Sequence, residues 1–251
     1  MRLAAPGAFA RAFVVCLLAC SPAFGGDAGI RPDLLAPDQA GERIYFFTGL
    51  HIARDSAFGW AGIAGAPFGL LDEDGVRLRL AGGTGRYRYR TSAVPGGINE
   101  GNVASGEILL GFHRSLGNGS VTAYLGAHME EQRLTAADPG NASAGTALGA
   151  KATLEFFRRL DPLWVASASA SASTVHRTYQ ARATLAREFA YGLAAGVEAA
   201  VLGDARYVEP RAGLSGSMTY GRGVLTIAAG LLFSTDKGGG GYATLSLHAP
   251  Y

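Results

Sequence analysis

Apolar and polar residues alternate strictly along most of this chain. In Trp164–Ser173 the even positions are Trp or Ala, whereas every odd position from Ser167 is serine. A period of two is that of a β-strand with one apolar and one polar face. Eleven further runs share this alternation, and they begin near residues 44, 58, 76, 108, 121, 148, 179, 193, 212, 225 and 243. The chain is therefore predicted to be all-β, with about twelve strands.

The segments between these runs predict a single antiparallel up-and-down barrel. Every second joint is tight and rich in Gly, Asn, Asp or Pro, the residues that short turns require. An even strand number and short turns at one end are typical of bacterial outer-membrane barrels. The predicted tight turns are Asp72–Gly75, Gly117–Gly119, Asp161-Pro162, Tyr191-Gly192 and Gly221–Gly223, and the longer connections are Thr91–Asn102, Thr135–Ala144 and Ser234–Gly241.

The composition of the two faces favours a transmembrane barrel with lipid on its apolar side. The apolar faces are rich in Ala and Val, which fill a soluble core poorly. The last run, Tyr242–Tyr251, has apolar residues at every second position and ends on an aromatic residue, and it resembles the C-terminal signal recognised by the outer-membrane assembly machinery. Aromatic residues near the ends of runs predict interfacial girdles; these are Phe58, Trp60, Phe156, Trp164, Tyr179, Tyr220, Phe233 and Tyr251. A periplasmic β-sandwich or lipocalin-like barrel, with the polar face in water, is the alternative.

The N-terminus has the features of a cleaved secretory signal. Arg2 and Arg11 supply positive charge, residues 12–19 form an apolar stretch too short to span a bilayer, and Ala23-Phe24-Gly25 offers a cleavage site. We predict a signal peptide over residues 1–25, a polar leader over 26–41 and the barrel domain over 42–251. Both cysteines lie in the signal, so the mature chain would have no disulfide. Acylation of Cys20, as in a lipoprotein, is an alternative.

The overall composition excludes several other classes of protein. The 251 residues include 37 glycines, only 17% are charged, and the formal net charge is +2. So much glycine argues against an all-helical fold. The aromatic content and the low net charge argue against disorder. The chain has no basic block that could neutralise nucleic-acid phosphates.

The polar faces carry charges of both signs in similar numbers, which predicts a network across the lumen. Its members would be Arg77, Arg79, Glu107, Lys151, Glu155, Arg182, Glu198 and Arg211. The carboxylates, with Glu130, also permit a glycosidase pair, but the basic residues on the same face make a neutralised network the simpler interpretation. The five histidines lack metal-site spacing, and opposite parity argues against a dyad of Ser173 and His176. We therefore predict no catalytic residues, metal or cofactor.

A glycine-rich stretch, Gly82–Gly85, separates two parts of one long run. Its apolar residues change from even positions before it to odd positions after it, so a β-bulge is expected there. It lacks the context of a phosphate-binding loop. Beyond it, Arg86, Tyr87, Arg88 and Tyr89 would form an extracellular rim that contacts lipopolysaccharide or glycan, or is simply solvated. Asp138–Asn141 is interpreted as a turn, although a glycan or partner could bind there.

Three segments in order resemble the cellulose biosynthesis protein BcsS family of alphaproteobacteria. They are DGVRLRLAGGTGRYRY (74–89), DPGNASAGTALGAKATLE (138–155) and VEAAVLGDARYVEPRAG (197–213). The resemblance covers residues 40–251 and implies a non-enzymatic outer-membrane accessory to cellulose synthesis or secretion. The predicted barrel would contact outer-membrane lipid and lipopolysaccharide, and the resemblance implies cellulose or cellulose-synthase components as further partners. A lipid- or glycan-modifying enzyme and a passive pore unrelated to cellulose are the alternatives.

Overall fold

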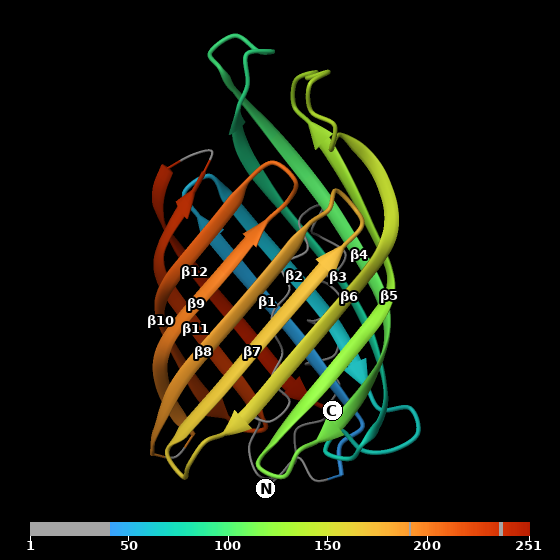
Figure 1. The fold of residues 1–251 in the computed structure, drawn as a ribbon, viewed down its shortest axis with the longest axis vertical. Helices are drawn as coiled ribbons and strands as arrows, with labels where there is room; N and C mark the ends of the chain where they lie inside the picture. Colours follow the sequence, from blue (N-terminus) through green and yellow to red (C-terminus); the bar gives the residue numbers. More distant parts are fainter. Residues whose placement is uncertain (1–40, 191, 236–237) are drawn as a thin grey trace, which may run out of the picture.

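The chain folds into a closed barrel of twelve antiparallel strands, seen in a computed structural model that describes residues 41–251 except 191 and 236–237 (Figure 1). Each strand pairs with its neighbours in sequence, and β1 pairs with β12, so no sheet edge is left open. The strands are β1 (Ile44–Ala53), β2 (Ser56–Gly65), β3 (Gly75–Arg90), β4 (Ile98–Ser115), β5 (Gly119–Leu134), β6 (Gly145–Arg159), β7 (Trp164–Ser173), β8 (Tyr179–Ala190), β9 (Leu193–Gly203), β10 (Val208–Tyr220), β11 (Gly223–Ser234) and β12 (Gly238–Pro250).

The predicted fold class is confirmed, with one strand for each of the twelve alternating runs. The predicted signal peptide, Cys20 and all but the last residue of the predicted leader lie outside the described residues. The barrel boundary at residue 42 remains a prediction, although β1 begins two residues later.

The first and last strands meet at one end of the barrel, which we call the terminal end. Tyr45 pairs with Pro250, and the Tyr251 amide donates to the Ile44 carbonyl at 2.9 Å. Most turns at this end span two to four residues, as expected. The β2–β3 connection is an exception, because it covers residues 66–74 and is not the tight turn expected at Asp72–Gly75.

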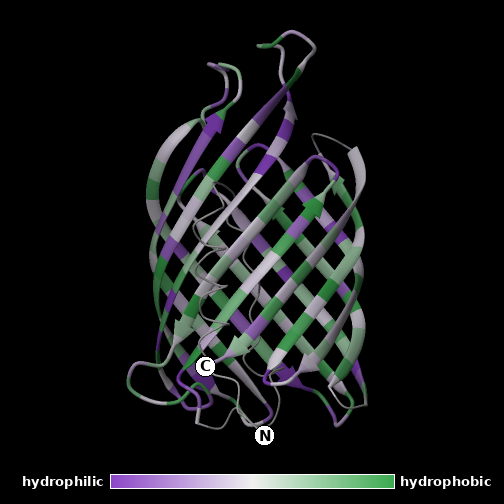
Figure 2. Ribbon diagram, turned by 180° about the vertical axis from the view of Figure 1, so that it is seen from behind, coloured by the Kyte–Doolittle hydropathy of each residue, from purple (hydrophilic) through white to green (hydrophobic). Residues whose placement is uncertain are grey.

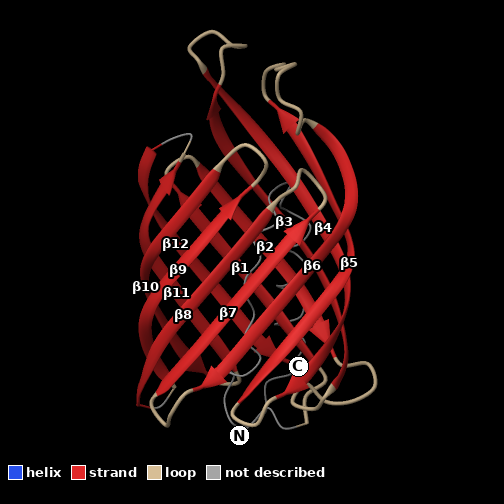
Figure 3. Cartoon of the chain, in the orientation of Figure 1, coloured by secondary structure: helices blue, strands red, loops and turns tan. Residues whose placement is uncertain are grey.

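The opposite end, here called the far end, is uneven in height. Strands β3 to β6 are 15 to 18 residues long, whereas the other strands have 10 to 13. Figures 1 and 3 show these longer strands rising above the rest. Their projecting parts and the connections 91–97 and 135–144 form what we call the crown. Strand pairing continues into two of the expected long loops, so these connections shorten to 91–97 and 235–237.

Apolar side chains are exposed on the outside of the barrel, and polar side chains are buried within it. Figure 2 shows hydrophobic and hydrophilic residues interspersed along the strands. Leu125 is 64% exposed and Leu214 is 69% exposed, whereas Arg79 and Glu130 are each 2% exposed. This is the inverse of a soluble barrel and is the distribution of a transmembrane barrel. Within the described part of the chain, no helix has the length and apolar character needed to cross a membrane.

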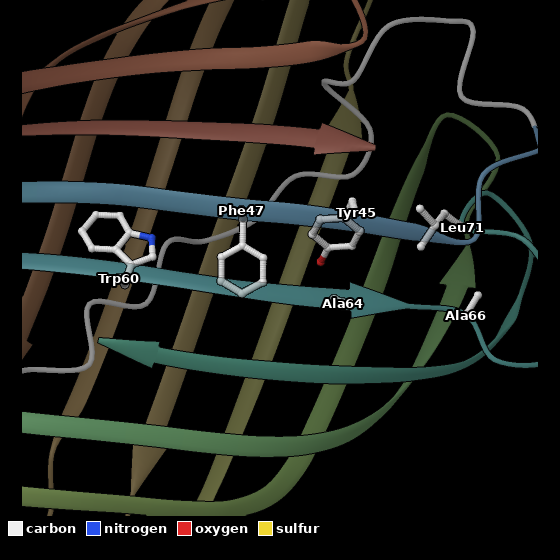
Figure 4. Packing of buried hydrophobic residues seen from close by; sticks show 6 residues of the cluster. All are labelled: Tyr45, Phe47, Trp60, Ala64, Ala66 and Leu71. Atoms are coloured by element: carbon white, nitrogen blue, oxygen red, sulfur yellow. The ribbon is translucent and has the colours of Figure 1, made fainter. Parts of the chain in front are cut away.

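An apolar cluster fills the part of the interior that lies against β1 and β2 (Figure 4). It contains Phe47 and Trp60, so the expected place of Trp60 in an outer girdle is wrong, and Phe58 also lines the interior. The outward positions of β2 are mostly small, so the more hydrophobic face of this strand points inward. Gly49 and Gly62 make this packing possible, because a Cβ atom at either would overlap the ring of Trp60 or Phe47.

The bulge expected at Gly82–Gly85 is also wrong. Strand β3 pairs with β2 and β4 through this stretch without interruption. The outward face of β3 is apolar at Leu78 and Leu80 but basic from Arg86 to Arg90. Beyond Leu80 the strand leaves the apolar band around the outside of the barrel, so its outward positions become basic and its apolar residues are those that point inward. The strand register itself does not change. A register shift does occur between β8 and β9, at Glu188 and Ala190.

Candidate functional site

Two clusters of ion pairs lie inside the barrel, and seven of the eight charged residues expected there divide between them. The first cluster joins β3, β4 and β6. Arg79 lies between two carboxylates, with its Nε 3.1 Å from Glu107 Oε1 and its Nη1 3.0 Å from Glu155 Oε1. Lys151 Nζ lies 2.7 Å from the other oxygen of Glu107. The charges of this cluster therefore neutralise one another inside the lumen.

Aromatic rings surround the same guanidinium. The Arg79 Cζ atom lies 5.1 Å from the centre of the Phe47 ring and 5.9 Å from that of Tyr124. Both distances fall within the range of cation–π contact. Arg79 thus links the ion pairs of β3, β4 and β6 to the apolar cluster of β1 and β2.

The second cluster lies across the lumen on β8, β9, β10 and β12. Arg182 Nη2 lies 2.9 Å from Glu198 Oε2, and the Tyr242 hydroxyl donates to Glu198 Oε1 at 2.9 Å. Arg211 pairs with Glu209 at 2.6 Å, and its guanidinium stacks 5.3 Å from the Tyr242 ring. The positive and negative groups of this cluster are therefore paired as well.

Arg77 belongs to neither cluster. Its guanidinium donates to the carbonyl oxygens of Leu70, Leu71 and Glu73, at 3.2, 3.0 and 2.6 Å. It therefore holds the β2–β3 connection at the terminal end. Because Arg77 is two residues from Arg79, alternation correctly predicts that both face the interior. The sequence does not indicate that Arg77 binds backbone carbonyl groups instead of carboxylates.

The clusters leave two cavities in the lumen. A cavity of about 60 Å³ lies toward the terminal end and is lined by Ser167, Ser217 and His248, among others. A larger one, of about 300 Å³, lies toward the far end and reaches the exposed Arg206. We call the larger one the outer cavity. Arg182 and Glu198 line both cavities, so their ion pair stands between them.

The outer cavity also contains a serine and a histidine in hydrogen-bond contact. Ser173 Oγ on β7 lies 2.8 Å from His128 Nδ1 on β5, and the Val175 amide donates to the same oxygen at 3.1 Å. The pair considered from the sequence was Ser173 with His176. His176 instead sits in the β7–β8 turn with a φ of 50° and its Nε2 lies 3.7 Å from Glu130.

The residues expected at the rim lie on opposite faces of β3. Tyr87 and Tyr89 lie on the inner side of the crown and line the outer cavity, whereas Arg86 and Arg88 are exposed on the outer side of the crown. The Tyr87 hydroxyl donates to Gln132 at 2.7 Å. The four residues therefore form two surfaces, and the expectation of one mixed Arg/Tyr patch is wrong.

Asp138, in the turn predicted at Asp138–Asn141, anchors the second tyrosine. The Tyr89 hydroxyl donates to Asp138 Oδ2 at 2.9 Å, and the Gly140 amide donates to Oδ1 at 3.0 Å. The hydrogen bond from Tyr89 is the main cause that holds the pKa of Asp138 below its usual value. The turn is thus tied to the inner side of the crown.

Several interior residues were not expected from the sequence. Glu209 and Tyr242 share the parity of the inner positions on their own strands, so alternation alone could have indicated them. Alternation could not indicate that Trp60 is an interior residue. The rule assigns the more hydrophobic face of each strand to the outside, whereas in β2 this face points inward. In the described ranges, no group of three or more His, Cys, Asp or Glu side chains is arranged to hold a metal ion.

Comparison with known proteins gives one family match. A family model described as "Cellulose biosynthesis protein BcsS" matches residues 45–251. No curated protein sequence matches the chain. Among solved structures, the KdgM porin has a TM-score of 0.46 and 5% identity, covering 82% of this chain and 99% of its own. The transport unit of the autotransporter AIDA-I from Escherichia coli has a TM-score of 0.45 and 10% identity, covering 86% and 92%.

Proposed function

Because the chain belongs to the cellulose biosynthesis protein BcsS family, we propose that it is a non-enzymatic accessory to cellulose synthesis or secretion. It would be exported by the signal peptide over residues 1–25 and inserted in the outer membrane of a Gram-negative bacterium. The terminal end would face the periplasm and the crown would face the medium, as short periplasmic turns and taller outer ends are typical of such barrels.

The division of the lumen is the observation that carries this proposal. Ion pairs and aromatic rings occupy its middle, and the larger cavity lies at the far end. A barrel filled in this way suits a component that contacts the polymer or its machinery at the cell surface. It suits an open conduit less well, because a passing glucan would have to displace the Arg182–Glu198 pair.

The test is extracellular cellulose in a clean deletion strain, compared with wild type and with a complemented strain. We expect the polymer to be lost or mislocated in the deletion, while an immunoblot shows that the synthase is still present. Complementation should restore it. Unchanged cellulose in the deletion would contradict the proposal and favour a structural or passive barrel.

We also propose that the outer side of the crown contacts lipopolysaccharide phosphates. Arg86, Arg88 and Arg90 are exposed on the outward face of β3, just beyond Leu78 and Leu80 of the apolar band. Guanidinium groups bind phosphate through paired hydrogen bonds. Glu100 pairs with Arg88 at 2.8 Å, so Arg86 and Arg90 carry more of the expected contact.

Purified lipopolysaccharide should therefore raise the thermal unfolding midpoint of the detergent-solubilised barrel. In a variant with Arg86→Gln and Arg90→Gln, the rise should be clearly smaller. A variant with Arg158→Gln, at the terminal end of β6, is the control and should retain it. Equal stabilisation of all three proteins would contradict this contact.

An enzymatic role is the second candidate, because Ser173 and His128 are 2.8 Å apart. A serine nucleophile requires a neighbouring base of this kind. The family supports an accessory, so this candidate ranks second, and its test is given in the Discussion.

A further inference from the structure

The outer cavity has the dimensions and the position of a binding site. Its volume of about 300 Å³ lies at the lower end of the range for small-molecule sites. It is walled by strands from both sides of the barrel, including β2 at Trp60, β3 at Tyr87 and β8 at Arg182. The ion pair of Arg182 and Glu198 forms part of its floor, and the crown stands above it. A ligand would therefore enter from the far end.

Paired charges give the cavity lining little net attraction for an ionic ligand. Arg182 is matched by Glu198 at 2.9 Å, and Arg211 is matched by Glu209 at 2.6 Å. Lys151, which also lines the cavity, has its Nζ 2.7 Å from Glu107. An anionic ligand would have to compete with these carboxylates for each cation. The lining thus favours a ligand that is polar but neutral.

Aromatic rings and polar groups alternate in the lining. Phe58, Trp60, Tyr87 and Tyr89 contribute rings from the two adjacent strands β2 and β3. The hydroxyls of Tyr87 and Tyr89 are hydrogen-bonded to Gln132 and to Asp138, respectively, and the two ring centres are 5.7 Å apart. These hydrogen bonds fix the orientation of both rings, so binding would require little further ordering.

Hydrogen-bonding capacity remains near these rings. His51 Nδ1 contacts Thr244 Oγ1 at 3.2 Å, whereas its Nε2 is buried with no hydrogen-bond partner in the described part of the chain. Buried polar atoms normally have a partner, so this nitrogen can form a hydrogen bond with a ligand hydroxyl. The amide of Asn141 and the hydroxyl of Ser143 also line the cavity.

From this combination we infer that the outer cavity binds a short segment of a neutral polysaccharide. The C–H faces of pyranose rings pack on aromatic side chains, and their hydroxyls exchange hydrogen bonds with amides, imidazole and serine. Trp60 and Tyr87 supply the packing surfaces, and His51 and Asn141 supply hydrogen bonds. The identification of the sugar as a β-linked glucan rests on the proposed function, whereas its neutral character rests on the paired charges.

Tryptophan fluorescence offers a direct test, because the two tryptophans lie in different places. Trp60 lines the outer cavity, whereas Trp164 begins β7 at the terminal end and is 38% exposed on the barrel surface. A Trp164→Phe variant therefore leaves Trp60 as the only reporter. Cellohexaose titrated into this purified variant should change its fluorescence in a saturable way, and calorimetry on the wild-type barrel should give the same affinity.

Two comparisons make the test specific. In the Trp164→Phe background, Tyr87→Ala should weaken cellohexaose binding by about tenfold or more, as loss of a central aromatic contact typically does. Tyr220→Ala, on the outer surface at the terminal end, is the matched control and should bind normally. Oligogalacturonate, an acidic saccharide, should bind at least tenfold more weakly than cellohexaose.

Absence of both the fluorescence change and binding heat would overturn the inference, as would equal or tighter binding of oligogalacturonate. The deletion experiment tests the proposed function separately from this binding site. Cellohexaose binding with unchanged cellulose in the deletion strain would support this site and contradict the proposed function. Lost cellulose without any cellohexaose binding would support the proposed function and contradict the site.

Discussion

Arg182 on β8 and Glu198 on β9 form an ion pair that separates the two cavities of the lumen, with Nη2 2.9 Å from Oε2. The Tyr242 hydroxyl donates to the same carboxylate and holds it in place. Because both charged side chains line both cavities, their removal would join the space above them to the space below.

Replacement of this pair should therefore open the lumen to ions. We expect a variant with Arg182→Ala and Glu198→Ala to give resolved conductance steps in planar bilayers, severalfold larger than those of the wild-type barrel. Substitution of both residues also avoids leaving one buried charge unpaired. The control removes Glu131 and Arg133, which pair at 2.8 Å in the crown, and should conduct like wild type. No increase in the first variant would show that the barrier lies elsewhere.

The apolar outer surface of the barrel makes a depth-dependent prediction about stability. Leu125 and Met129 both point outward on β5, Leu125 near the middle of the apolar band and Met129 next to the polar Glu131. Leu125→Arg should lower the free energy of unfolding in lipid vesicles by about 2–4 kcal/mol, and Met129→Arg by about 0–1 kcal/mol. Urea unfolding followed by tryptophan fluorescence measures both. Equal losses at the two positions would contradict this placement of the membrane.

The contact between Tyr89 and Asp138 predicts how the crown responds to acid. The hydrogen bond from Tyr89 lowers the pKa of Asp138 in the folded protein. A lowered pKa stabilises the folded turn above the usual aspartate pKa, and this contribution disappears as the pH falls through the folded value. Tyr89→Phe should move the Asp138 pKa up toward its usual value, as measured by carboxyl carbon NMR shifts.

Tyr87→Phe is the control for that titration, because the Tyr87 hydroxyl donates to Gln132 instead. It should leave the Asp138 pKa as in wild type. If both substitutions shifted this pKa equally, the Tyr89 hydrogen bond would not be its main cause.

Ser173 distinguishes an accessory from an enzyme. For a non-enzymatic barrel, Ser173→Ala should give the same extracellular cellulose as wild type, and a fluorophosphonate probe should not label the purified protein. Ser169→Ala, on the same strand and face, is the matched control. Labelling that is lost only in Ser173→Ala, together with reduced cellulose, would favour the enzyme and contradict the accessory role.

Alternation along the chain was sufficient to predict the strands and their number. Strand pairing repeats every two residues, so the polar positions of β7 or β9 follow from the sequence alone. The same parity placed Arg79, Glu107 and Glu198 inside the lumen. It failed at β2, where glycine and alanine cover the outside and Phe58 and Trp60 turn inward.

The sequence by itself therefore determined which residues share a face, because that depends only on local strand geometry. Only the tertiary structure decided which side chains meet across the lumen, because this depends on the closure of β1 on β12 and on the register of every pair between them. It separated the contacts of Arg77 from those of Arg79, and it paired Ser173 with His128. Contacts between strands distant in sequence have no local signal, since each is set by the curvature of the whole barrel.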